Sequence, residues 1–153
     1  QIGPVFTLAE EYGKDDTSSQ EYLAILDLHD GEAVATSGDS EKVVEKGGEL
    51  YSHIINPHIG RLLQLNDSTL AQAVVVSKSC MFADALATAA ISVENPSQAR
   101  ALLDPFRTGF REPIQDFLLY ARRGPRIVRL SIPGVEPKEQ RVKRLANHDP
   151  ASV

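Results

Sequence analysis

The feature that most constrains the fold of this chain is the change of pattern at Ser79. Before it, Ala73-Val74-Val75-Val76 is a continuous apolar run that contains three β-branched valines, which is typical of a buried strand. After it, residues 80–90 are rich in alanine and favour a helix, for which Ser79 is a suitable N-cap. The sequence therefore predicts a helix that begins just past the end of a buried strand.

This predicted helix carries two oxygen-bearing side chains four residues apart, Asp84 and Thr88. Residues at this spacing lie on one helix face, and a carboxylate beside a hydroxyl suits Mg²⁺. The alternative is structural, because an acid near a helix start is favoured by the helix dipole and a threonine often bonds back to a carbonyl. Spacing alone favours the structural alternative.

Upstream, residues 21–29 alternate in the manner of a strand and end at the turn Asp30-Gly31. We predict that residues 33–36 pair with this strand as a hairpin. The hairpin would present Thr36-Ser37-Gly38-Asp39 at its far end. Two hydroxyls, a glycine and an acid suit either a plain turn or a turn that holds an oxygen-rich group.

A second predicted hairpin turns at Gly47-Gly48 and continues as the strand 50–55, which ends at Asn56-Pro57. His53 lies near the end of this strand. A lone histidine there is more often structural than catalytic, but its titration near pH 7 also suits a general base. We expect residues 61–70 to form a connector, and Ser97 to cap a short helix that runs to Leu103.

Composition narrows the classes of partner. The length of 153 residues suits one domain, and the net charge of −5 argues against nucleic acid or an anionic membrane as the main partner. No stretch has the length of an apolar membrane span, and no signal peptide is visible. The lone Cys80 excludes an internal disulfide, and its apolar neighbours predict a buried, inert thiol. The compartment is not predicted.

Three motifs occur together in one order: Ala35-Thr36-Ser37-Gly38-Asp39, then residues 53–60 (His-Ile-Ile-Asn-Pro-His-Ile-Gly), then residues 83–89 (Ala-Asp-Ala-Leu-Ala-Thr-Ala). In order and spacing they resemble the C-terminal half of the ApbE family, the FAD:protein FMN transferases. The resemblance runs from near Gln1 to about Val128. It implies an α+β, T-fold-like half-domain over residues 1–132, with antiparallel strands and a few packed helices. The polar tail 133–153 is expected to be solvated or to dock onto a partner.

The resemblance also implies roles for these residues. Thr36, Ser37, Gly38 and Asp39 would line the flavin and phosphate side of the site. His53 would activate the acceptor hydroxyl, and Asp84 with Thr88 would bind Mg²⁺. The implied activity is cleavage of FAD, with transfer of FMN to a Thr or Ser of an acceptor flavoprotein. Because the family has a further N-terminal half, the resemblance implies a second chain that supplies it.

The chain departs from the family pattern at three positions, with Ser40 in place of an aromatic residue, Asn56 in place of Asp and Ile59 in place of Thr. The loss of the carboxylate at 56 removes a charge that would favour the His53 imidazolium. These changes support an alternative, a catalytically degenerate subunit with a structural or assembly role. A third option is hydrolysis of FAD to FMN and AMP without transfer.

Overall fold

The structure is a computed structural model that describes residues 5–10, 21–39, 43–108, 114–123, 126–130 and 142–143. Three antiparallel sheets and three helices make up these residues, so the α+β prediction is confirmed. The elements are β1 (Val5–Glu10), β2 (Glu21–Asp27), β3 (Ala33–Gly38), β4 (Val43–Lys46), β5 (Glu49–Asn56), β6 (Arg61–Gln64), β7 (Leu70–Ser77), α1 (Cys80–Ile91), α2 (Pro96–Leu103), α3 (Pro105–Thr108), β8 (Asp116–Arg123), β9 (Arg126–Arg129) and β10 (Val142–Lys143).

The chain forms two compact units, one of Gln1–Asp30 with Ile132–Val153 and one of Gly31–Ser131. In the first unit, β2 pairs in antiparallel fashion with both β1 and β10. The predicted boundary between a half-domain at 1–132 and a tail at 133–153 stays a prediction. Most of that tail lies outside the described residues, and Ser40 of the family pattern does too.

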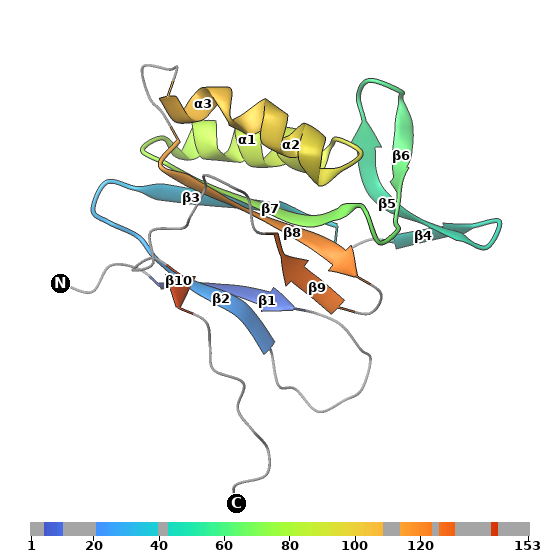
Figure 1. The fold of residues 1–153 in the computed structure, drawn as a ribbon, viewed down its shortest axis with the longest axis horizontal. Helices are drawn as coiled ribbons and strands as arrows, with labels where there is room; N and C mark the ends of the chain where they lie inside the picture. The colour runs from blue at the N-terminus through green and yellow to red at the C-terminus, as the bar shows by residue number, and fades with distance from the viewer. Residues whose placement is uncertain are drawn as a thin grey trace, which may run out of the picture. The chain divides into compact units, whose positions relative to one another are not determined.

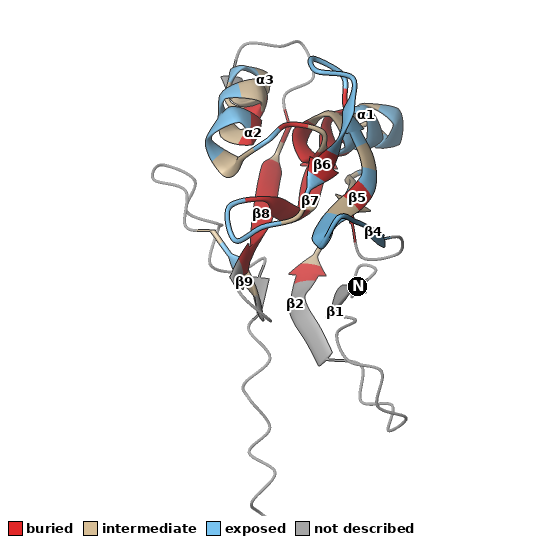
Figure 2. Cartoon of the chain, turned by 90° about the vertical axis from the view of Figure 1, so that its right-hand side faces the viewer, coloured by how far each residue is buried: buried red, intermediate tan, exposed pale blue. Residues whose placement is uncertain are grey.

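The second unit is built on a sheet of order β3-β7-β8-β9, and α1 packs against β3 and β7 on one face of it. Figure 1 shows α1 and α2 lying side by side over that face. The predicted buried strand and capped helix are both confirmed: β7 is buried along almost its whole length, and the Ser79 side chain accepts a hydrogen bond from the Phe82 backbone N–H. In Figure 2 the buried residues concentrate on β7 and β8.

The same unit holds a second sheet, of order β4-β5-β6. Its first hairpin turns at Gly47-Gly48, as predicted, and both glycines have positive φ angles that other residues rarely adopt. Residues 61–64, expected to belong to a connector, instead form β6 and pair with β5. Among the described residues, no helix is long and apolar enough to cross a membrane.

Three local predictions were wrong. The hairpin predicted between residues 21–29 and 33–36 is not formed. Instead, β3 pairs with β7 from Ala33↔Ser77 to Gly38↔Gln72, and the described pairings of β2 are with β1 and β10. The partner of β3 is thus β7, a buried apolar strand distant in sequence, and not the preceding strand β2. Cys80 is exposed, because the buried face of α1 begins only at Ala83. The N-cap of α2 is Asn95, whose side chain accepts from the Gln98 N–H, and not Ser97.

Candidate functional site

The structure brings the first and third motifs together at the edge where β3 meets α1. The Ser37 Oγ and the Thr88 Oγ1 lie 3.2 Å apart, although the two residues are 51 positions apart in the chain. Thr88 therefore bonds across to the strand. Asp84 lies one helical turn before Thr88, and both are exposed. Asp84 also lies beyond the first turn of α1, which contains no acidic residue, so the helix dipole gives little reason for it.

These three side chains can be tested against the needs of Mg²⁺. A carboxylate and two hydroxyls are hard oxygen donors, but Mg²⁺ takes six oxygens in an octahedron. Among the described residues there is no cluster of three or more His, Cys, Asp or Glu placed to hold a metal ion. The residues at 37, 84 and 88 therefore offer oxygen types that Mg²⁺ accepts but too few of them for a full site, and the remaining oxygens would come from water, phosphate or other protein groups.

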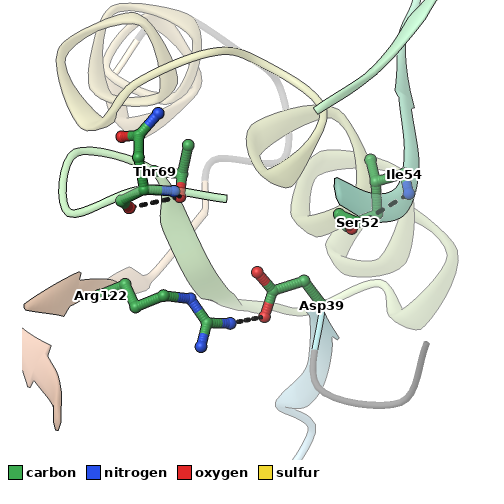
Figure 3. Close-up of polar contacts among 6 residues, drawn as sticks. Asp39, Ser52, Ile54, Thr69 and Arg122 are labelled. Atoms are coloured by element: carbon green, nitrogen blue, oxygen red, sulfur yellow. Dashed lines mark hydrogen bonds and ion pairs between the residues drawn. The ribbon is translucent and has the colours of Figure 1, made fainter. Parts of the chain in front are cut away.

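Asp39, whose role in lining a ligand site stays a prediction, has a buried side chain. Only 2% of its side chain is exposed, and its Oδ1 lies 2.7 Å from the Nη2 of Arg122 on β8, whose side chain is 9% exposed (Figure 3). Burial raises the pKa of Asp39, and the hydrogen bond and charge of Arg122 oppose that rise. Removing one partner of such a buried pair leaves an uncompensated charge and costs about 3–5 kcal/mol.

The backbone around Asp39 explains the glycine of the same motif. The Asp39 N–H donates to the Ala71 carbonyl oxygen over 3.1 Å, which ties the end of β3 to the start of β7. A Cβ atom at Gly38 would lie 3.1 Å from that same oxygen. Gly38 eases this close approach of two backbone segments, because a side chain there would crowd the oxygen, and its φ angle is not positive. The glycine thus lets the motif pack directly against β7.

His53 is exposed on β5, between buried Ser52 and half-buried Ile54, whose N–H donates to the Ser52 Oγ (Figure 3). The prediction that His53 lies near the end of a strand is confirmed, because β5 ends at Asn56. In its protonated form, His53 would add a small lowering of the pKa of Asp39, after the larger effects of burial and of Arg122.

Two of the departures from the family pattern can be placed. Asn56 is buried, its Oδ1 accepts from the His58 N–H and its carbonyl oxygen accepts from the Gly60 N–H, so its side chain and backbone both hold the turn after β5. An amide meets these needs without burying a charge. Ile59 is 51% exposed in this turn, and nothing in the structure explains it.

Arg122 is the residue that the sequence motifs did not indicate. It follows the apolar run 117–121 and lies next to Arg123, at the end of β8 where it pairs with β9. The signal that could have found it is the acid at the end of β3, since a carboxylate buried against a core requires a cation. Only the tertiary structure shows that Asp39 is buried.

The Gly31–Ser131 unit contains a groove of about 970 Å³. Its walls come from the hairpin of β4 and β5, from β6, from the turn before β7 and from Glu94 and Asn95 after α1. None of the predicted site residues lines it. The groove is therefore a separate feature from the cluster of Ser37, Asp39, Thr88 and their neighbours.

Comparison with known proteins shows which family this chain resembles. A model of the ApbE family matches residues 10–110. The FAD:protein FMN transferase of Vibrio cholerae is 40% identical over 79 residues, which are 52% of this chain and 22% of that protein. The FAD:protein FMN transferase of Chlamydia trachomatis is 36% identical over 75 residues, which are 49% of this chain and 23% of that protein.

A solved structure is similar over more of the chain. The crystal structure of the flavinyl transferase ApbE from Pseudomonas stutzeri, in its apo form, aligns with a TM-score of 0.55 at 30% identity. The alignment covers 82% of this chain and 34% of that one. The chain thus spans between 22% and 34% of the length of these three proteins.

Proposed function

Because the chain belongs to the ApbE family, we propose that it carries part of the active site of an FAD:protein FMN transferase. Its substrates would be FAD and an acceptor protein with a free Thr or Ser hydroxyl. The observation that carries the proposal is the 3.2 Å contact between the Ser37 and Thr88 hydroxyls. This contact joins two motifs, far apart in the chain, that the resemblance assigns to the phosphate side and to the metal.

In the proposed reaction the acceptor oxygen attacks the phosphorus on the FMN side of the FAD pyrophosphate. A bond forms between that oxygen and phosphorus, the bond to the bridging oxygen breaks, and AMP leaves with the bridging oxygen. His53 takes the proton of the attacking hydroxyl, which is the role of a general base. Thr36 and Ser37 would hold phosphate or flavin oxygens at the end of β3.

Asp84 and Thr88 would hold Mg²⁺ for this reaction. The bound ion would offset the negative charge that builds up on the pyrophosphate oxygens in the transition state. The protein contributes a rigid platform, since α1 packs on β3 and β7 through buried residues on one face, namely Ala83, Leu86, Ala87, Ala90 and Ile91. The exposed face is left free for Asp84 and Thr88.

The direct test measures AMP release and the FMN mass on protein when FAD and Mg²⁺ are added to the purified chain with whatever copurifies. We expect Asp84→Ala to lower the rate by about 10²–10³-fold, the usual cost of losing one group that stabilises developing charge. Glu45→Ala, which removes an exposed carboxylate on β4, is the matched control and should leave the rate unchanged. Equal rates in the two variants would contradict the proposed metal site.

The alternative, a degenerate subunit with a structural role, is favoured by the structural use of Asn56, which holds a turn through hydrogen bonds to residues 58 and 60. The same experiment separates the two. Neither FAD binding nor AMP release, in a preparation that contains a stably bound partner chain, would favour the structural role. Release of AMP without FMN on any protein would favour hydrolysis.

The remaining part of the family's fold, predicted to come from a second chain, stays a prediction. The chain would be expected to copurify with a protein that contains the preceding part of an ApbE fold. Recovery of a lone chain with full transferase activity would contradict it.

A further inference from the structure

The strongest feature outside the three motifs is the buried ion pair between Arg122 and Asp39. It joins two residues that are 83 positions apart, and the carboxylate has its Oδ2 buried without a hydrogen-bond partner among the described residues. A buried pair with one oxygen unsatisfied contributes little net stability compared with an apolar pair of the same size. Stability is therefore a weak reason for the pair, and a role in holding the backbone is a better one.

The ion pair fixes the end of β3, where Asp39 makes two separate contacts. Asp39 is bonded through its side chain to Arg122 and through its N–H to the Ala71 carbonyl. The Arg122 N–H in turn donates to the Thr69 carbonyl oxygen, just before β7, so the guanidinium starts from a fixed backbone. Figure 3 shows Arg122 reaching from β8 toward the end of β3.

Holding Asp39 in place also affects the position of the Ser37 hydroxyl, which lies on the proposed metal side of the site. Ser37 lies two residues before Asp39 on the same strand end, and its Oγ meets the Thr88 Oγ1. We infer that Arg122 is a positioning residue, which fixes the end of β3 through Asp39 and thereby holds the Ser37 hydroxyl against Thr88 on α1. It would touch neither FAD nor metal. The inference about position stands on the geometry alone, and its consequence for catalysis rests on the proposed function.

The first arm of the test measures position without activity. In a Cys80→Ser background, Ser37→Cys and Thr88→Cys place two thiols where hydroxyls now lie 3.2 Å apart, so that only a small movement is needed to reach the S–S distance of about 2.05 Å in a disulfide. The rate of cross-linking with oxidised glutathione then reports how well the two motifs are held together. Adding Arg122→Gln should slow it by about tenfold or more, since a misplacement of about 1 Å strongly lowers the rate of a reaction between fixed groups.

Tyr120→Phe is the matched control, because Tyr120 lies two residues earlier on β8 and its buried hydroxyl has no hydrogen-bond partner among the described residues. It should cross-link at the parent rate. If Arg122→Gln does not fold, the double variant Asp39→Asn with Arg122→Gln leaves no buried charge and takes its place. A folded Arg122 variant that cross-links as fast as Tyr120→Phe would overturn the inference.

The second arm measures catalysis in the full chain with whatever copurifies. Arg122→Gln should raise the Mg²⁺ concentration needed for half-maximal FAD cleavage by about tenfold while the KM for acceptor stays within about twofold. Arg122→Lys, which restores a cation, should recover part of that loss. An unchanged Mg²⁺ dependence would contradict the link to catalysis. If the parent chain cleaves no FAD, the proposed function fails, and the cross-linking rates still decide the positioning role.

Discussion

The two sheets of the Gly31–Ser131 unit differ sharply in how much of their apolar surface is covered. In the sheet β3-β7-β8-β9, residues such as Val74, Val75 and Leu119 are almost completely buried. In the sheet β4-β5-β6, all of β4 is exposed, and this sheet with its turns holds most of the exposed large apolar residues: Val43, Val44, Leu50, Ile55, Ile59 and Leu62. Figure 2 shows the contrast as red β7 and β8 against blue β4.

This difference separates the two halves of the candidate site. Ser37, Asp39 and Thr88 belong to the covered sheet and its helix, where packing and the Arg122 pair hold them in place. His53 belongs to the uncovered sheet, whose stability within the described chain depends mainly on strand pairing. The cluster of Ser37 and Thr88, which we propose lies on the metal side, is therefore held by buried neighbours, and His53, the proposed general base, is supported by far fewer buried contacts.

We expect the largest difference between the two sheets in the free energy of unfolding that is lost when a leucine is truncated to alanine. Leu119→Ala, at a position that is 1% exposed, should lower the free energy of unfolding by about 2–5 kcal/mol, because it removes buried apolar area and leaves a cavity. Leu50→Ala, at 46% exposed, should cost less than about 1 kcal/mol. Denaturant unfolding of both variants measures the difference. Equal losses would show that the second sheet is covered in solution.

A smaller effect is expected where β3 meets β7. Gly38→Ala places a Cβ 3.1 Å from the Ala71 carbonyl oxygen, and the backbone there cannot give way without straining the Asp39 hydrogen bond. We expect a loss of about 1–3 kcal/mol in unfolding free energy. The Ser37 to Thr88 cross-linking rate should fall as well. A variant of full stability would show that the strand end is looser than the structure indicates.

The smallest effect that we expect is on the pH dependence of the unfolding free energy, through the buried Asp39 at the end of β3. Since burial raises the pKa of Asp39 above its unfolded value, the folded state binds this proton more tightly. Its contribution to stability therefore falls as the pH rises from about 3.9 through the raised pKa. Asp39→Asn cannot titrate, so the stability difference between parent and variant should shift against the parent over this window.

Unfolding free energies measured at a series of pH values give that difference. Glu45→Gln, which removes an exposed carboxylate from the uncovered sheet, is the control for the loss of a negative charge. A difference between the parent and Asp39→Asn that stays constant, or grows in favour of the parent, would mean that the Arg122 charge outweighs burial.

The local elements could be predicted because each depends on residues close together in the chain. The continuous apolar run predicted β7, the alanine-rich run after Ser79 predicted α1, and Gly47-Gly48 predicted the first hairpin of the second sheet. The spacing of Asp84 and Thr88 also predicts that both lie on one face of that helix. β6 was missed because four residues are too few to show a period.

The sequence by itself thus determined the types of element and the motifs that identify the ApbE family. Only the tertiary structure decided that β3 pairs with β7, that Asp39 is buried and that Arg122 neutralises it. The physical reason is that helix period, turn geometry and capping depend on neighbouring residues. Strand pairing and the burial of a charge depend on which distant surfaces exclude water together, across 83 positions for Asp39 and Arg122.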